Sequence, residues 1–281
     1  MSVINISNLY KSFGDKEVLK GIDFKVDEGE ILGVLGPSGA GKTTLIEIMI
    51  GHLESDKGIS KIFDVSSTQL KDDSYSKIGT VLDEAGLFDR LTCRQNLEIF
   101  RKIYSIDKDE VNTVLQKVGL YESSNVAVDK LSKGMKQRLV LGRAIMHKPK
   151  LLFLDEPTSG LDPSTSQLIH KLLLELKQKG TTILLVTHNM QEATDLCDKV
   201  AFLFDGKIIE YDTPTRICDK HNELNQISIV TNHDKEFKVP NNKESYSEIL
   251  NALKDDEIKS IHSSEPNLGE VFISLTGKEL I

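Results

Sequence analysis

No apolar run in this sequence is long enough to cross a membrane as a helix. The stretches at 151–154 and 200–204, which are among the longest, hold only four and five residues, whereas a membrane-spanning helix needs about 20 apolar residues in a row. The first residues also lack the basic segment and apolar run of a secretory signal peptide. We therefore expect a chain that is soluble by itself and that reaches a membrane only through a partner.

Cysteines and an excess of basic residues are also lacking. Cys93, Cys197 and Cys218 are few and widely spaced, which argues against a disulfide framework or a zinc site and favours idle thiols in a reducing cytosol. The formal net charge is -8, because 43 acidic residues outnumber 35 basic ones. A broad nucleic-acid-binding face is therefore not expected, although a local basic patch is compatible with this charge. The 281 residues are enough for one large domain or for a large and a small one.

The pattern of apolar residues predicts an α/β fold. Apolar and polar residues alternate between 3 and 26, which favours antiparallel strands joined by turns at 14–15 and 28–29. Continuous apolar runs predict strands buried on both faces at 31–35, 151–155 and 181–188. Apolar residues at helical spacing predict helices at 45–49, 92–118, 132–149 and 168–176. This alternation of strands and helices is typical of a mostly parallel sheet.

The composition changes after Pro214. Residues 219–226 are polar and indicate a linker, beyond which 227–231 and 236–240 favour strands and 247–255 a helix. Asn267, followed three residues later by Glu270, matches the capping box that opens a helix. We therefore predict a large domain at 1–218 and a small α/β domain at 219–281.

A glycine-rich loop directly follows the first buried strand. Gly36 and Gly41-Lys42-Thr43 match the phosphate-binding P-loop, which also lies between a strand and a helix. Its backbone N–H groups turn toward phosphate oxygens at the positive end of the helix. Lys42 is expected to bridge the β- and γ-phosphates, and the Thr43 hydroxyl to ligate Mg²⁺. The predicted ATP contacts of this loop are Gly36, Pro37, Ser38, Gly39, Ala40, Gly41, Lys42, Thr43 and Thr44.

Two carboxylates end the buried strand at 151–155. Asp155 and Glu156 come where ligands bind in open α/β sheets, at the carboxyl end of a strand. Asp155 is expected to hold Mg²⁺, directly or through water. Glu156 is expected to accept a proton from the water that attacks the γ-phosphate.

Four further segments complete the pattern. LSKGMKQR at 131–138 is followed by Ser159-Gly160-Leu161-Asp162 and by Thr187-His188, and Phe13 precedes them all. In this order, over residues 1 to about 215, the sequence resembles the ATP-binding-cassette (ABC) ATPases, with their signature motif (usually LSGGQ), D-loop, switch histidine and adenine-stacking aromatic residue. The resemblance implies a P-loop NTPase core with an antiparallel β subdomain and a helical signature subdomain at about 85–147.

The same resemblance implies a catalytic unit of two chains. Two copies would pair head to tail and enclose two ATP molecules, and Asp162 would lie where the copies meet. Ser132 and Gly134 of one copy would reach the ATP on the P-loop of the other, with Ser132 capping the signature helix. His188 would hydrogen-bond the γ-phosphate and hold the attacking water, and Phe13 would stack on adenine.

Two positions depart from the family pattern. Asp83 stands at the end of the strand IGTVL, where the family usually has a glutamine that touches Mg²⁺ and the lytic water. Aspartate is a harder oxygen ligand, which supports the hypothesis that Asp83 binds Mg²⁺ in the closed state. Lys133 replaces a glycine of the signature and opposes the helix dipole. It either points into solvent or attracts a nearby γ-phosphate.

The last residues resemble a narrower group. Residues 265–277 are similar to the tail of the ABC-2 exporter ATPases. This similarity implies the ATP-binding and ATP-hydrolysing subunit of a bacterial exporter for drugs, antibiotics, peptides or lipids. Such a subunit would act as a homodimer or pseudo-homodimer on the cytoplasmic face of the cell membrane, attached to a separate integral membrane permease. The cargo stays open, because its contacts lie in the permease.

Other functions fit less well. Ribosome-associated ABC ATPases usually carry two cassettes in one chain and DNA-repair types carry long coiled-coil insertions, and neither feature is found in this sequence. The acidic charge also disfavours nucleic acid as a partner. A regulatory or immunity module with incidental hydrolysis stays an alternative. A plain P-loop kinase or GTPase would lack the signature and the D-loop.

Overall fold

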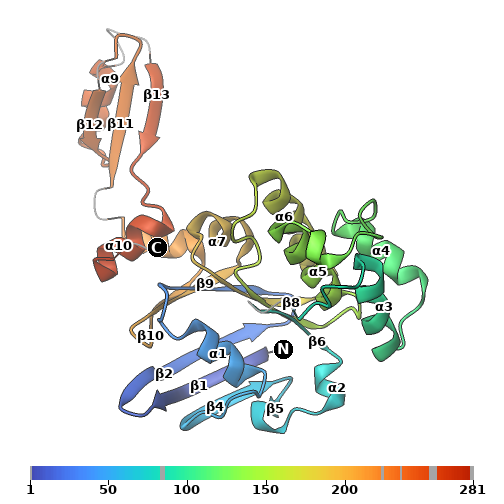
Figure 1. Cartoon of the computed structure of the whole chain (residues 1–281). Coiled ribbons are helices and arrows are strands. Elements are labelled where there is room, and N and C mark those ends of the chain that lie inside the picture. Colours follow the sequence, from blue (N-terminus) through green and yellow to red (C-terminus); the bar gives the residue numbers. More distant parts are fainter. Residues whose placement is uncertain (1, 83–85, 223–224, 235, 253–257, 279–281) are drawn as a thin grey trace. The chain divides into compact units, whose positions relative to one another are not determined.

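The computed structural model in Figure 1 describes residues 2–82, 86–222, 225–234, 236–252 and 258–278. The chain forms two compact units, the first reaching Thr213 and the second starting at Pro214. Helix α8 (Pro214–Lys220) spans the division that the sequence predicted at 218/219, and the assignment of 1–218 and 219–281 as domains stays a prediction. The polar stretch predicted as a linker is helical at its first two residues.

The N-terminal strands form a four-stranded antiparallel sheet in the order β2-β1-β4-β5. Its members are β1 (Ser2–Phe13), β2 (Lys16–Asp27), β4 (Lys57–Ile62) and β5 (Val65–Ser66). Strand β2 runs through Gly21 without interruption. Leu9 pairs with Ile22 and Tyr10 with Lys20, so Gly21, at φ 77°, is the extra residue of a β-bulge. The bulge keeps β2 a single long strand.

A six-stranded sheet carries the predicted α/β core. Its order is β10-β9-β3-β8-β7-β6, from β3 (Ile31–Leu35), β6 (Ile78–Val81), β7 (Leu151–Asp155), β8 (Thr182–Thr187), β9 (Lys199–Phe204) and β10 (Lys207–Asp212). All pairs are parallel except β9 with β10. Every residue of β3 and β8 is buried, which confirms the prediction from their continuous apolar runs. The carboxyl ends of β3, β8 and β7 therefore meet at one edge.

Helix α1 (Lys42–Met49) is anchored in the main apolar core. Its buried residues join a cluster with side chains from both sheets, which includes Leu45, Ile46, Phe24, Phe153 and Val186. Burial of such side chains is worth about 1.5–3 kcal/mol each. The loop before α1 is thus held at a fixed place relative to β7 and β8.

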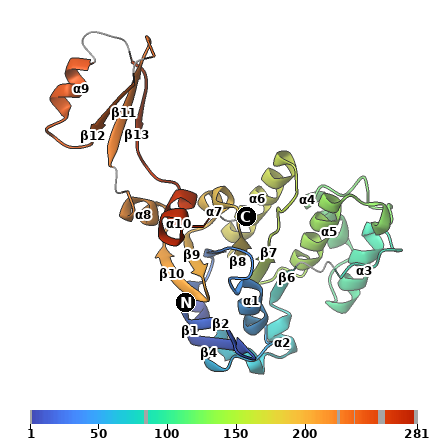
Figure 2. The same ribbon diagram turned by 60° about the vertical axis from the view of Figure 1, so that its left-hand side comes forward.

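The prediction of one helix at 92–118 is wrong, because the structure has two. Helix α3 (Cys93–Ile103) opens with a capping box of Thr92 and Gln95, and α4 (Asp109–Lys117) follows it. Ser105 between them has φ 52°, a left-handed conformation that an α-helix does not continue through. Figures 1 and 2 show α3 and α4 grouped with α5 (Lys133–Ile145), and the three helices pack against one another.

The remaining helices of the first unit border the strand ends. They are α2 (Asp72–Tyr75), α6 (Pro163–Gln178) and α7 (Met190–Leu196). Helix α6 begins just after β7 and α7 just after β8, so each strand leads through a short loop into a helix. These two loops contain Glu156 and His188, whereas Lys42, the third residue predicted to be catalytic, lies at the start of α1.

The second unit is a small α/β unit. Its antiparallel sheet has the order β12-β11-β13, from β11 (Gln226–Thr231), β12 (Glu236–Pro240) and β13 (Ile258–Ser263), with α9 (Tyr246–Ala252) between β12 and β13. Helix α10 (Leu268–Thr276) opens with the predicted capping box of Asn267 and Glu270 and packs against α8. The sequence did not predict β13, whose residues are mostly exposed. Across the described residues, no helix has the length and apolarity to span a membrane.

Candidate nucleotide site

The P-loop lies between β3 and α1, and two of its positions require glycine, each for a different structural reason. Gly41 caps α1 at φ 109°, a backbone conformation that other residues rarely adopt. A Cβ at Gly36 would lie 2.2 Å from the carbonyl oxygen of Leu203 in β9, which no side chain allows. The local sequence thus fixes both the turn of the loop and its close approach to the sheet.

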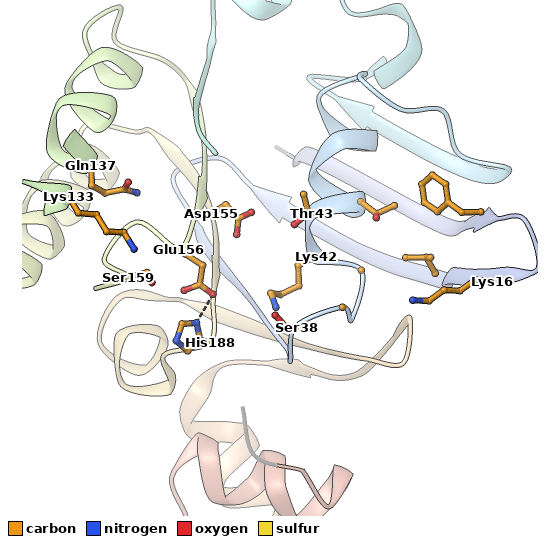
Figure 3. Close-up of a pocket in the computed structure, with 15 residues that line it drawn as sticks. Lys16, Ser38, Lys42, Thr43, Lys133, Gln137, Asp155, Glu156, Ser159 and His188 are labelled. Carbon is orange, nitrogen blue, oxygen red and sulfur yellow. Dashed lines mark hydrogen bonds and ion pairs between the residues drawn. The ribbon is translucent and has the colours of Figure 1, made fainter. Parts of the chain in front are cut away.

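The loop holds the ammonium group of Lys42. Its Nζ donates hydrogen bonds to the carbonyl oxygens of Gly36, at 2.7 Å, and Pro37, at 3.0 Å. Burial lowers the pKa of Lys42, while the nearby carboxylates of Glu156 and Asp155 oppose this shift. Figure 3 shows Lys42 and Ser38 facing these two carboxylates. A compact positive charge therefore lies between the loop and the end of β7.

Glu156 follows β7 in a constrained backbone conformation. Its φ is 49°, which is uncommon for a residue with a Cβ and is usually maintained by its surroundings. Here its N–H donates to the carbonyl oxygen of Val186 in β8, at 2.9 Å. The strained position directs the carboxylate away from the sheet and toward His188.

His188 follows β8 and contacts Glu156 directly. Its Nδ1 lies 2.7 Å from Oε1 of Glu156, the contact drawn as a dashed line in Figure 3. Both side chains are partly exposed, 28% for Glu156 and 48% for His188. The pair is therefore accessible from the cavity and joins the ends of two neighbouring strands.

A cavity of about 670 Å³ brings most of the predicted residues together. This volume lies within the usual range of small-molecule sites, about 300–1,000 Å³. The predicted residues that line it are Phe13, Ser38, Gly39, Gly41, Lys42, Thr43, Thr44, Asp155, Glu156 and His188. Phe13 is 51% exposed at the end of β1, as expected of a ring available for stacking.

Five further residues line the cavity without having been predicted as contacts: Lys16, Val18, Lys133, Gln137 and Ser159. For Lys16 a signal existed, because the turn at Gly14 pairs it with Phe13. For Gln137 the signal was its position four residues after Lys133, which places both on one face of a helix. Ser159 lies in the D-loop, which the sequence had assigned to the interface between copies.

Six predicted residues do not line this cavity. Gly36, Pro37 and Ala40 belong to the loop but do not form its wall, whereas Ser132, Gly134 and Asp162 lie on other segments. Ser132 caps α5 by accepting a hydrogen bond from the N–H of Met135. A Cβ at Gly134 would lie 3.0 Å from Leu161, so the signature helix packs closely on the D-loop. Asp83 falls outside the described residues.

Asp162 has a local role in the structure. It caps α6 and accepts hydrogen bonds from both hydroxyls of the first turn, Ser164 and Thr165, each at 2.6 Å. The side-chain bonds from Ser164 and Thr165 hold the pKa of this carboxyl well below its ordinary value. Asp162 is therefore ionised and held in position, and its role between copies stays a prediction.

The donor set near the P-loop suits Mg²⁺ held jointly by protein and nucleotide. Among the described residues no group of three or more His, Cys, Asp or Glu side chains is arranged to hold a metal. Thr43 and Asp155 supply one hydroxyl and one carboxylate on the cavity wall. Mg²⁺ commonly takes one or two such protein ligands and completes its shell with phosphate oxygens and water.

Known proteins resemble this chain over most of its length. The family model described as "ABC transporter" matches residues 19–159. A fluoroquinolone export ATP-binding protein of Mycobacterium tuberculosis is 35% identical over 93% of this chain and 88% of the relative. A linearmycin resistance ATP-binding protein of Bacillus subtilis is 31% identical over 99% of both chains. A Nod factor export ATP-binding protein of Bradyrhizobium diazoefficiens is 34% identical over 99% of this chain and 97% of the relative.

Solved structures give the same result for the fold. The ATP-binding subunit of an ABC transporter superposes with a TM-score of 0.72 at 27% identity, over 78% of this chain and 92% of that one. A dimeric ATP-binding cassette in a post-hydrolysis state, bound to ADP and Pi, superposes with a TM-score of 0.67 at 27% identity, over 75% of this chain and 98% of that one.

Proposed function

Since this chain belongs to the ABC transporter family of ATP-binding proteins, we propose that it hydrolyses ATP at the Glu156–His188 pair and thereby powers export through a separate membrane subunit. The chain is an ATPase with the cassette fold. The observation that carries the assignment of the site is the 2.7 Å contact between Glu156 and His188 across the cavity from Lys42.

Binding of ATP rests on the P-loop and on Phe13. The N–H groups of the loop and the ammonium of Lys42 would hold the β- and γ-phosphates. The exposed ring of Phe13 would stack on adenine. Thr43 and Asp155 would hold Mg²⁺, which when bound neutralises developing charge on the transferred phosphoryl group.

Hydrolysis requires a base and an oriented water. Glu156 would accept a proton from the attacking water at one of its two carboxylate oxygens. The hydrogen bond with His188 decides which oxygen faces the water. His188 has a second ring nitrogen, Nε2, available for the γ-phosphate. The pair would thus align the base with the phosphorus and exclude unproductive orientations of the carboxylate.

The active unit is proposed to be a head-to-tail homodimer. Ser132, Gly134 and Asp162 do not line the chain's own cavity, as expected if they serve the ATP of a second copy. The N-terminus of α5, capped by Ser132, would then present its free N–H groups to the partner's γ-phosphate. The dimeric cassette with bound ADP and Pi supports a dimer as the active unit.

Export is the proposed use of the hydrolysis energy. Three relatives that match nearly the whole chain are named for export of, or resistance to, fluoroquinolones, linearmycin and Nod factor. We place this chain at the cytoplasmic face of the membrane, bound to a permease encoded separately. A drug, an antibiotic or a lipid-like molecule is the proposed class of cargo.

ATP turnover by the purified chain tests the proposal. Wild-type protein should release phosphate from ATP in the presence of Mg²⁺, and Glu156→Gln should lower the turnover about 10²–10⁴-fold, the usual contribution of a general base. Glu175→Gln, an exposed change on α6, is the matched control and should keep wild-type turnover. Unchanged turnover in Glu156→Gln would overturn the site, and failure to co-purify with a membrane protein would overturn the export role.

A further inference from the structure

A buried carboxylate belongs to a residue that is bonded to both loops of the Glu156–His188 pair. Glu192 in α7 is only 1% exposed, although ionisable side chains are rarely buried unless they are paired. Its Oε1 accepts a hydrogen bond from the hydroxyl of Thr158, at 2.7 Å, and lies 3.1 Å from Nε2 of His170. Neither the sequence patterns nor the nucleotide contacts account for this side chain.

The contacts of Glu192 keep it ionised. Burial alone raises the pKa of a carboxyl, but the contacts of Oε1 with His170 and Thr158 help to outweigh it, and the pKa of Glu192 lies below its ordinary value. The hydroxyl of Thr187 accepts a hydrogen bond from the N–H of Asn189, at 3.0 Å, whereas Oε2 of Glu192 is buried without a hydrogen-bond partner among the described residues. An ionised, buried carboxylate of this kind holds its donors strongly, because each donor would otherwise be left without a partner.

The partners of the carboxylate, and the residues next to the cap of α7, lie in segments that carry functional residues. Thr158 lies two residues after Glu156 and begins the segment that ends at Asp162. Thr187 immediately precedes His188. His170 lies in α6, the helix that Asp162 caps. The carboxylate of Glu192 therefore joins the loop of the base to the helix after the D-loop, and its backbone N–H is bonded to Asn189 in the loop of the histidine.

Glu192 is itself fixed to the histidine loop. Asn189 caps α7 by accepting hydrogen bonds from the N–H groups of Gln191, at 3.0 Å, and Glu192, at 3.1 Å. The cap joins the backbone after His188 to the backbone of Glu192 within one helical turn. A movement of α7 would therefore move His188 and the carboxylate of Glu192 together.

We propose that Glu192 is a positioning residue that sets the placement of Glu156 relative to His188 and links both to the D-loop segment. The inference rests on the proposed hydrolysis at this pair. Glu192 touches neither nucleotide nor water in this account. It acts through Thr158 and through the cap at Asn189, each within two residues of a catalytic group.

The steady-state kinetics of ATP hydrolysis by full-length variants test the proposal. In Glu192→Gln the carboxylate charge is lost while the size is kept, and we expect kcat to fall at least about tenfold while the Kd for ATP stays within about twofold of wild type. Thr158→Val should lower kcat in the same way, and Thr158→Ser, which restores the hydroxyl, should recover most of it. Rescue by serine separates the hydrogen bond from the volume of the side chain.

A matched control separates positioning from general destabilisation. Thr181 is also buried and donates a hydrogen bond to the carbonyl oxygen of Pro149, away from the cavity. Thr181→Val should lower the melting temperature but leave kcat per folded molecule unchanged. Each kcat is therefore divided by the folded fraction measured by circular dichroism.

The outcomes are distinguishable. A wild-type kcat in both Glu192→Gln and Thr158→Val overturns the inference but leaves the proposed function intact, since wild-type protein still hydrolyses ATP. Equal loss of kcat per folded molecule in Thr181→Val also overturns it, because the effect would then not be specific to the contacts of Glu192. If Glu192→Gln does not fold, the comparison of kcat between Thr158→Val and Thr158→Ser decides whether the inference holds. Absence of hydrolysis in the wild type would overturn the proposed function itself.

Discussion

Nδ1 of His188 lies 2.7 Å from Oε1 of Glu156, so the loops after two neighbouring parallel strands meet in a single hydrogen bond. Residue 155 of β7 pairs with Val186 of β8, and the backbone N–H of Glu156 is bonded to the same Val186. The strand register thus brings the two side chains to the same edge. The contact is therefore a consequence of sheet topology as well as of the two loop sequences.

Loss of His188 should reduce turnover without preventing binding. His188→Ala removes the hydrogen bond that orients Glu156, and we expect kcat to fall about tenfold or more, the equivalent of about 1.4 kcal/mol or more. The Kd for ATP should change much less, because the P-loop supplies most of the phosphate contacts. Phosphate-release kinetics and equilibrium binding of a fluorescent ATP analogue measure the two effects. His52→Ala, an exposed histidine, serves as control; equal effects in both variants would contradict the role.

Lys42 should be required for binding itself. Lys42→Met removes the ammonium that the carbonyl oxygens of Gly36 and Pro37 hold, and we expect at least about a tenfold rise in the Kd for ATP, because charge-assisted hydrogen bonds to phosphate are worth about 1.5–3 kcal/mol. Titration calorimetry with ATP and Mg²⁺ measures this. Lys71→Met, at an exposed position, should bind as wild type does. Wild-type affinity in Lys42→Met would remove Lys42 from the site.

Lys133 offers a test of the departure from the signature motif. It lines the cavity together with Glu156 and Ser159, and a Cβ at Gly160 would lie 3.4 Å from its Nζ. If its charge attracts a γ-phosphate, Lys133→Gly should raise the KM for ATP severalfold and change folding stability by only a few tenths of a kcal/mol. The variant restores the residue usual in the family. The control Lys130→Gly, at an exposed position, should leave the KM for ATP unchanged. An equally unchanged KM in Lys133→Gly would show that Lys133 points into solvent.

Acid should weaken the fold through Glu192. Because hydrogen bonds hold its pKa in the folded state below the 4.5 of an ordinary glutamate, its ionised form stabilises the fold fully above that value. The contribution is lost as the pH falls through the lower folded-state pKa. We expect wild type to lose more free energy of unfolding than Glu192→Gln between about pH 7 and pH 3. Urea denaturation at both pH values measures this, and an equal loss in the two proteins would contradict the assignment.

The sequence was sufficient to locate an element where one segment contains the whole pattern that predicts it. Continuous apolar runs located β3, β7 and β8, and the polar residues directly after them mark the edge where the cavity lies. It failed at 92–118, because the turn at Ser105 lies within an apolar pattern that suits one long helix.

Local sequence patterns did not predict contacts between segments that are distant in the chain. Thr158, His170 and Glu192 are unremarkable singly in the sequence, and only the fold brings the first two to the carboxylate of the third. Lys16 enters the cavity through the register of the hairpin that starts at Phe13. Such residues are found from pairing and packing, because no local periodicity distinguishes them from ordinary polar positions.

The most direct test of the account is the mass of Glu156→Gln in the presence of ATP. This variant should bind ATP but hydrolyse it slowly, so the ATP-bound dimer should accumulate. Size-exclusion chromatography with light scattering is expected to give twice the monomer mass with ATP and Mg²⁺, and the monomer mass with ADP. A monomer under both conditions, or turnover equal to that of wild type, would contradict the proposal that two copies together complete the site and that Glu156 is its base.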